Sequence, residues 1–255
     1  MYLDIFLDAM KNRFKKRIHI DLYSGSGMSE RPRSSCLRAG SPFIALDRQP
    51  KFDHYIFCEK NGQDLRALEA RIASHFPDQK PSIIPGDCNE QVDRINQELN
   101  KVIGDLGDST LTFCFIDPYA LDVHFETIKK LAENRKMDFM INIMLGLDVK
   151  LNWRAYLADS SLTIANFLGS QDWRNGLGKN ITPPSLSLYV GEKFSAQMAS
   201  LGYLHTNPSK DFLPFENSKS RIIYYIGFFS KGRIAFKFWD DAKKYGGADS
   251  ELFSR

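Results

Sequence analysis

Strand-like and helix-like segments alternate between residues 18 and 145, and this alternation most constrains how the chain can fold. Helical patterns are expected at 41–46, 61–75, 90–103 and 124–135, and apolar runs predict strands from residue 18 and at 54–58, 82–84, 111–116 and 138–144. The run at 111–116 is apolar on both faces, as is typical of a central parallel strand covered by helices on each side. The sequence therefore predicts an α/β fold with a doubly wound, mostly parallel central sheet.

The segments on either side of this alternation predict additions to one domain over 1–255. Residues 2–16 carry apolar side chains at three- and four-residue spacing, which predicts an amphipathic helix before the first strand. The stretch 28–40 is mixed in character and predicts a loop. We expect a helical and irregular insertion over about 148–200 and a C-terminal antiparallel hairpin from 203–208 and 222–230.

Composition favours an ordinary cytoplasmic protein. No run approaches the roughly 18 apolar residues of a membrane span, and the N-terminus lacks a basic lead followed by an apolar signal core. The four cysteines, Cys36, Cys58, Cys88 and Cys114, are widely spaced and form no C-x-x-C pair. We therefore interpret them as reduced thiols and predict no metal site.

A glycine-containing turn follows the first predicted strand, from Asp21 through Tyr23 and Ser24 to Gly25 and Gly27. The two glycines allow the backbone to turn tightly and to approach a ligand without interference from a Cβ atom. The carboxylate of Asp21 is expected to orient the loop or to accept hydrogen bonds from a bound amine. The turn is therefore a candidate cofactor loop.

Acidic residues end four successive predicted strands, namely Asp21, Glu59, Asp87 and Asp117. Open α/β sheets bind ligands at the carboxyl ends of their strands, so we expect these side chains at one edge. Glu59 can accept from both hydroxyls of a ribose, Asp87 can accept from an adenine amino group, and the Cys88 amide can donate to a ring nitrogen. Together they predict an adenosyl pocket. The alternative is that each carboxylate caps the helix that follows it.

Several short motifs resemble those of the three-Cys-motif partner proteins, a family of the class I S-adenosylmethionine-dependent methyltransferase superfamily. The resemblance implies a Rossmann-like methyltransferase fold with S-adenosylmethionine (SAM) as cofactor and S-adenosylhomocysteine (SAH) as product. It implies a protein with a cysteine motif as a possible partner, but it does not supply a substrate. The motifs are Asp21 to Gly27, Gly40-Ser41-Pro42, Gly86-Asp87, Phe115-Ile116-Asp117-Pro118-Tyr119, and Phe167-Leu168-Gly169 with Trp173.

The turn Asp117-Pro118-Tyr119 looks like the D-P-P-Y signature of enzymes that methylate exocyclic amino groups of nucleic-acid bases. In that chemistry the carboxylate and a proline carbonyl accept the amino protons, while the aromatic ring stacks on the extruded base. The second proline is absent, because Ala120 follows Tyr119. A comparable D-P-F-G turn in the tRNA guanine-N2 dimethyltransferases is compatible with amino methylation. The alternative is a purely structural strand-ending turn.

Two groups of basic residues are candidates for holding an RNA or DNA backbone, and we expect both to border the same cleft. The alternative is a solvated surface without a binding role. The first group is Lys11, Arg13, Lys15, Lys16 and Arg17, and the second is Arg31, Arg33 and Arg38.

The sequence supports three hypotheses about function. The first is a SAM-dependent methyltransferase that acts on an amino group of a nucleic-acid base, with Asp117, Pro118 and Tyr119 as the catalytic turn. The second is a SAM-binding or structural partner of another protein, without turnover. The third is a methyltransferase for a small molecule, for which activity would not depend on salt.

Overall fold

The computed structural model describes residues 2–30, 37–217 and 219–246 of the 255-residue chain. These residues divide into two compact units. The described residues of unit 1 lie within 1–115, 134–138 and 233–255, and those of unit 2 lie within 116–133 and 139–232.

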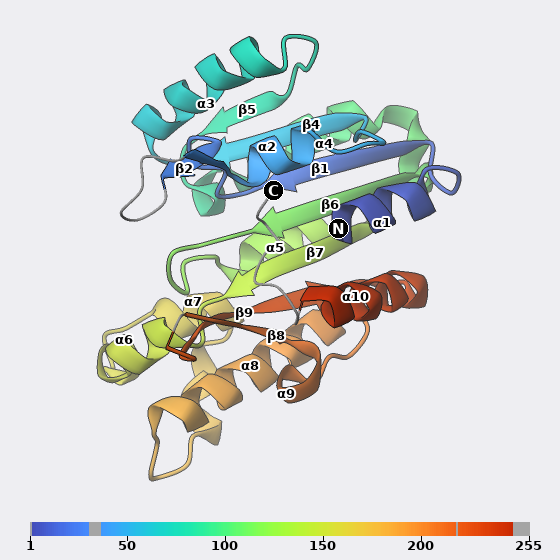
Figure 1. Ribbon diagram of the computed structural model, residues 1–255. Coiled ribbons are helices and arrows are strands. Elements are labelled where there is room, and N and C mark those ends of the chain that lie inside the picture. Colours follow the sequence, from blue (N-terminus) through green and yellow to red (C-terminus); the bar gives the residue numbers. More distant parts are fainter. Residues whose placement is uncertain (1, 31–36, 218, 247–255) are drawn as a thin grey trace. The chain divides into compact units, whose positions relative to one another are not determined.

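Four parallel strands form the sheet of unit 1, in the order β5-β4-β1-β6 (Figure 1). The chain runs outward from β1 to β4 and β5, then returns to place β6 on the other side of β1. The order therefore reverses beside β1, which makes the carboxyl end of β1 a topological switch point of the kind where α/β proteins bind ligands. The strands are β1 (Lys16–Asp21), β4 (His54–Glu59), β5 (Ser82–Pro85) and β6 (Thr110–Ile116), whose last residue belongs to unit 2.

Helices connect these strands as the sequence predicts. The side chain of Asn61 accepts from the backbone N–H groups of Gln63 and Asp64, which fixes the start of α3. The helices of unit 1 are α1 (Tyr2–Met10), α2 (Ser41–Leu46), α3 (Gly62–His75), α4 (Cys88–Ile103) and α10 (Arg233–Gly246), with the 3₁₀ segment η1 (Gly104–Ser109).

Aromatic side chains fill part of the unit 1 core around His19 of β1. The imidazole is 2% exposed and meets the rings of Phe52, Phe57 and Phe113 at centroid distances of 5.1, 6.2 and 5.8 Å. Full burial of one such phenylalanine contributes about 1.5–3 kcal/mol. This packing fixes β1, and with it the loop that leaves its carboxyl end.

Unit 2 holds an antiparallel arrangement in the order β7-β9-β8, with helices from 147 to 211 (Figure 1). Phe194 of α8 stacks on Phe167 of α7 at 4.5 Å, and Trp173 is 2% exposed. The strands are β7 (Met137–Ile143, entering unit 2 at Phe139), β8 (Leu213–Glu216) and β9 (Ile222–Phe229), and the helical segments are α5 (Phe125–Ala132), α6 (Leu147–Leu157), α7 (Thr163–Leu168), η2 (Gln171–Gly176), α8 (Pro183–Ser200) and α9 (Pro208–Asp211).

The predicted fold class is confirmed, including the C-terminal antiparallel strand and the helical insertion over 148–200. The predicted helix over 2–16 is too long, because α1 ends at Met10 and Lys16 already belongs to β1. The Lys15 N–H donates to the Ser109 carbonyl, and Lys16 pairs with Thr110. Sheet pairing therefore overrides the helical spacing at this point.

The predicted hairpin is right for 222–230 but wrong for 203–208. The partner of β9 is β8, because Asn207 caps α9 and Pro208 begins it. Proline has no N–H to donate to a strand partner, and its fixed φ suits the first turn of a helix.

The predicted loop at 28–40 contains two short antiparallel strands, β2 (Met28–Glu30) and β3 (Leu37–Ala39). The helix α10 was not expected. No described helix combines the length and the apolar character needed to cross a bilayer.

Candidate cofactor and substrate sites

The turn after β1 is tied down by hydrogen bonds to its own strand and to β4. Asp21 is fully buried, and its Oδ1 accepts from the Tyr23 N–H at 3.1 Å. The backbone N–H and the hydroxyl of Ser24 both lie 3.1 Å from the Cys58 carbonyl. The predicted orienting role of Asp21 thus has a structural basis, since its buried carboxylate accepts a hydrogen bond from the loop backbone.

The two glycines of this turn have different structural requirements. Both have positive φ, +57° at Gly25 and +76° at Gly27. A Cβ atom at Gly25 would meet nothing within 4 Å, whereas one at Gly27 would lie 2.7 Å from the Phe43 ring and 2.8 Å from Leu68 Cδ1. Gly25 therefore leaves an open side on which a ligand can approach the backbone. Gly27 is required instead by packing against α2 and α3, which the sequence did not reveal.

Glu59, at the end of β4, connects two loops. Its Oε2 accepts from the Gly25 N–H at 2.7 Å, and its Oε1 accepts from the Asn61 N–H at 2.7 Å. A carboxylate has about four lone-pair positions, so each oxygen retains one acceptor position for a further donor. The geometry leaves Glu59 able to receive two hydroxyl groups, as a ribose requires.

Asp87 caps α4 and also lies two residues beyond Pro85, the β5 partner of Glu59. Its Oδ1 accepts from the Asn89 N–H and its Oδ2 accepts from Lys60, both at 2.9 Å. Burial alone would raise the pKa of Asp87, but these hydrogen bonds bring it below its usual range. The capping alternative thus holds for Asp87, which remains a charged acceptor at the edge of the sheet.

Cys88 is the first residue of α4, so its backbone N–H is among those without a partner inside the helix. Its thiol is buried, and burial raises its pKa to about 12. Cys58 and Cys114 are also buried free thiols, and burial raises their pKa values as well. Cys36 lies outside the described residues.

Taken together, the unit 1 residues fit an adenosyl group. The open side of Gly25, the free acceptor positions of Glu59 and the charged Asp87 come from the carboxyl ends of three neighbouring strands, β1, β4 and β5. The acceptors match the ribose hydroxyls and an exocyclic amine, and the Cys88 N–H matches a ring nitrogen.

The Asp117 turn belongs to unit 2 and follows β6 directly. Asn142 of β7 donates through its Nδ2 to Asp117 Oδ1 at 2.6 Å. Although Asp117 is exposed, the protein around its carboxylate raises its pKa, and the hydrogen bond from Asn142 opposes that rise. Pro118 is buried and Tyr119 is 92% exposed, so the aromatic ring stands free for contact with another molecule.

Two residues near Asp117 escaped the sequence prediction. Asn142 lies in an apolar strand pattern that predicts only core packing, and its role emerges only from the fold. Burial, together with the negative charge of Asp117, raises the pKa of Tyr224, so its hydroxyl stays protonated. A polar residue inside an otherwise apolar strand was the one available signal for Asn142.

Not all residues of the first basic group lie beside the glycine turn. Lys16 and Arg17 begin β1, at the opposite end of the strand from Asp21. Arg17 pairs with Asp53 at 3.1 Å, and Lys16 donates to the Val102 carbonyl at 2.6 Å. The expectation that both basic groups line one cleft is therefore wrong for these two residues, whose charges are engaged in holding the fold.

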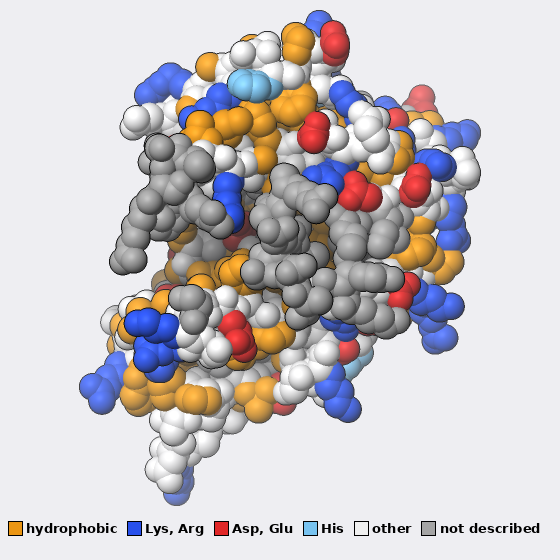
Figure 2. Space-filling model, viewed as in Figure 1, with side chains coloured by type: hydrophobic (Ala, Val, Ile, Leu, Met, Phe, Trp, Pro, Cys, Tyr) orange, Lys and Arg blue, Asp and Glu red, His pale blue; other side chains and the backbone are white. Residues whose placement is uncertain are grey.

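The other basic residues have different positions. Lys11 pairs with Asp8 at 2.9 Å. Arg38 is exposed on β3, two residues before Gly40. The Gly40 N–H donates to the Gly27 carbonyl, which places β3 next to the glycine turn. On the face drawn in Figure 2, described Lys and Arg side chains are spread among acidic and apolar ones. Arg13 lies in the exposed turn after α1 and Lys15 just before β1, while Arg31 and Arg33 lie outside the described residues.

No protein-family model matches the chain, and no curated protein matches it. Among solved structures, a putative caffeoyl-CoA O-methyltransferase from Staphylococcus aureus is 14% identical over 89% of this chain and 82% of its own, with a TM-score of 0.44. The O-methyltransferase TomG from Streptomyces achromogenes, solved with SAM, is 10% identical over 90% of this chain and 79% of its own, with a TM-score of 0.44.

The DszA carbon methyltransferase is 14% identical over 90% of this chain and 52% of its own, with a TM-score of 0.48. The fold assignment rests on the strand order within each unit. The resemblance to the three-Cys-motif partner family stays a prediction.

Proposed function

We propose that this protein is a SAM-dependent methyltransferase that modifies an exocyclic amino group of a base in RNA or DNA. One observation carries the proposal: Glu59 and Asp87 lie at the ends of adjacent strands beside a glycine turn that is open at Gly25. Bound SAM supplies an electrophilic methyl group and leaves as SAH. The remaining roles belong to residues of the chain.

In unit 1, Glu59 is proposed to hold the ribose through its unused acceptor positions, and Asp87 to accept from the adenine amino group. Lys60 and the helix N-terminus keep Asp87 charged. Asp21 does not need to touch the ligand, because its buried carboxylate already shapes the loop through Tyr23. These contacts orient the cofactor and exclude alternative poses.

In unit 2, Asp117 is proposed to accept a hydrogen bond from the amino group that receives the methyl. Asn142 fixes Oδ1, while Oδ2 makes no hydrogen bond to a described residue. A raised pKa makes the carboxylate a stronger acceptor, and the Pro118 carbonyl is the second acceptor proposed for the amino protons. Stacking on Tyr119 contributes about 1–3 kcal/mol and offsets part of the few kcal/mol needed to unstack a base.

The first test is thermal unfolding of the purified protein with SAM and with SAH. Ligand at 100 times its dissociation constant stabilises the folded state by about 2.7 kcal/mol. We expect a clear shift in wild type that is lost in Glu59→Gln, which keeps the size of the side chain but removes its charge. No shift at millimolar ligand would exclude the adenosyl pocket.

The second test is transfer of a labelled methyl group from SAM to RNA and to DNA. Asp117→Asn keeps the shape of the side chain but replaces one acceptor oxygen with a donor, so we expect SAM binding without transfer. Transfer at the wild-type rate by Asp117→Ala would refute the catalytic assignment and leave the cofactor site intact.

The same measurements separate the other hypotheses. A SAM-induced shift without transfer to any acceptor would favour a SAM-binding partner protein, and salt-independent activity without nucleic acid would favour a small-molecule substrate.

We propose membership of the three-Cys-motif partner family on the motifs alone. Co-purification of a protein with that cysteine motif would support it.

A further inference from the structure

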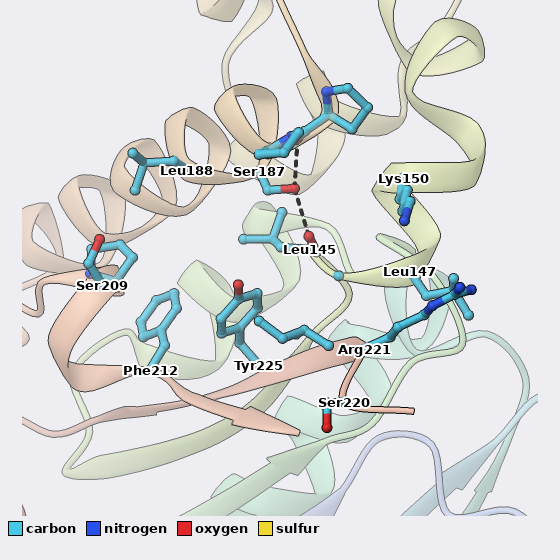
Figure 3. A pocket seen from close by; sticks show the side chains of 15 residues that line it. Leu145, Leu147, Lys150, Ser187, Leu188, Ser209, Phe212, Ser220, Arg221 and Tyr225 are labelled. Atoms are coloured by element: carbon cyan, nitrogen blue, oxygen red, sulfur yellow. Dashed lines mark hydrogen bonds between the residues drawn. The ribbon is translucent and has the colours of Figure 1, made fainter. Parts of the chain in front are cut away.

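A cavity of about 470 Å³ lies within unit 2, beyond the carboxyl end of β7 (Figure 3). Its walls come from the loop after β7, the first turns of α6 and α8, the α9 segment and the start of β9. Ligand pockets in proteins commonly span roughly 300–1,000 Å³. The space therefore suits a small organic molecule.

The wall of this cavity is held in place by hydrogen bonds within the protein. The Ser187 hydroxyl of α8 lies 2.7 Å from the Leu145 carbonyl and 3.0 Å from the Pro183 carbonyl, as the dashed lines in Figure 3 show. These contacts pin the first turn of α8 to the loop after β7. A wall held by such hydrogen bonds lowers the ordering cost of binding.

Most of the lining is apolar. Leu145 and Phe212 are buried beneath the cavity, Tyr225 is half-buried, and Leu188 at the rim is 45% exposed. Burial raises the pKa of Tyr225, so its ring carries a neutral hydroxyl. Such a lining favours a ligand with an apolar, planar body.

Two cations stand at one side of the cavity. Figure 3 shows Lys150 and Arg221 on the side opposite Phe212 and Ser209. Neither forms an ion pair with another described residue, and no carboxylate is among the lining residues. A ligand with a negative group at this end would meet two uncompensated positive charges.

The carboxylate nearest to Lys150 in sequence is already occupied. Asp148 Oδ1 accepts from Asn152 and its Oδ2 accepts from the Tyr156 hydroxyl, both at 2.7 Å. Asp148 is therefore bonded within its own helix and forms no ion pair with Lys150.

The cavity is separate from the Asp117 turn. Successive side chains of a strand point to opposite faces of the sheet, so Tyr225 faces the cavity and Tyr224 faces away from it. Tyr224 stacks on Phe215 at 4.8 Å and feels the charge of Asp117. A ligand in the cavity would thus lie across β9 from the proposed catalytic turn.

We propose that this cavity binds a small organic anion whose apolar body packs against Tyr225 and Phe212 and whose negative group pairs with Lys150 and Arg221. An aromatic carboxylate and a nucleoside monophosphate share this chemistry. The proposal does not depend on methyl transfer, because every residue it uses lies outside the proposed cofactor and catalytic residues.

The test is calorimetric titration of the 255-residue protein with naphthoate, with its neutral analogue naphthamide, and with uridine monophosphate. We expect at least one of the two anions to bind, and the double variant Lys150→Ala with Arg221→Ala to weaken that binding about tenfold or more. Binding of naphthoate alone would identify a free carboxylate as ligand, and binding of uridine monophosphate alone a nucleotide.

Two controls keep the result specific. Lys179→Ala removes an exposed cation of unit 2 that does not line the cavity and is expected to bind like wild type. Naphthamide is expected to bind wild type and the double variant equally. The proposal is wrong if neither anion binds wild type, or if the double variant binds as tightly as Lys179→Ala. No methyl donor is present, so failure here is independent of the proposed function.

Discussion

Replacing each glycine of the turn after β1 by alanine separates its packing role from its ligand role. An L-residue in the left-handed region costs about 1–2 kcal/mol, and the loss of unfolded-state freedom returns roughly 0.4–1 kcal/mol. Gly25→Ala, at φ +57° with open space around the new Cβ, is therefore expected to cost about 1 kcal/mol.

Gly27→Ala carries the same backbone strain and also a clash. Its Cβ would lie 2.7 Å from the buried Phe43 ring and 2.8 Å from the buried Leu68 side chain. Overpacking adds about 1–3 kcal/mol, which gives a total of about 2–4 kcal/mol. At about 2–4 °C per kcal/mol for a chain of this size, Gly25→Ala lowers Tm by a few degrees and Gly27→Ala by two to four times as much.

The assay pairs thermal unfolding by circular dichroism with calorimetric titration of SAM. Gly25→Ala is expected to weaken SAM binding about tenfold or more, because its Cβ occupies the open side of the loop, while its Tm falls by only the few degrees given above. Gly178→Ala is the matched control, since it has neither positive φ nor a neighbour within 4 Å. Equal destabilisation by the two loop variants would refute the packing argument, and unchanged SAM affinity in Gly25→Ala would refute the ligand role.

Three further predictions concern charged and buried groups. Glu59→Ala removes the acceptor of two 2.7 Å hydrogen bonds and is expected to cost about 2–4 kcal/mol in urea unfolding, with Glu59→Gln retaining roughly half; equal stability of the two variants would contradict this. Burial lowers the pKa of His19 from 6.5 to about 3, so between these values the unfolded chain binds a proton that the folded chain does not. Stability therefore falls as pH drops below 6.5, by up to about 1.4 kcal/mol per unit, and urea unfolding of His19→Phe across this range is expected to lack that slope. Arg17→Ala breaks the pair with Asp53 and lowers Tm without changing RNA affinity, whereas Arg38→Ala weakens RNA binding in low salt; the reverse pattern would exclude the β3 side as the nucleic-acid surface.

The sequence predicts the central strands well because their side chains are apolar on both faces. The run at 111–116 and the segment ending at Glu59 leave few alternatives to buried parallel strands. Periodicity fails where pairing decides the structure. The helical spacing of Phe14 with the residues before it continues past Met10, yet Lys15 and Lys16 pair with η1 and β6.

The candidate site is predictable only in part. Asp21, Glu59 and Asp87 follow apolar strands, so their common edge can be inferred from alternation of strand and helix. Asn142 reaches Asp117 across 25 residues of sequence, and the cavity beside Tyr225 is assembled from four separate segments. No local pattern encodes either arrangement, because both depend on how β7, β9 and α8 pack.

Glu59 links occupancy of the proposed adenosyl pocket to the dynamics of two backbone amides. Its oxygens hold the N–H groups of Gly25 and Asn61, and a ligand that uses the remaining acceptor positions leaves both bonds in place. By linkage, a ligand that binds only the closed arrangement makes opening of either loop more costly. Hydrogen exchange at Gly25 and Asn61 will then slow together on ligand addition, while amides in unit 2 keep their rates. The protein thus carries a built-in reporter of this pocket that needs neither a label nor a known substrate.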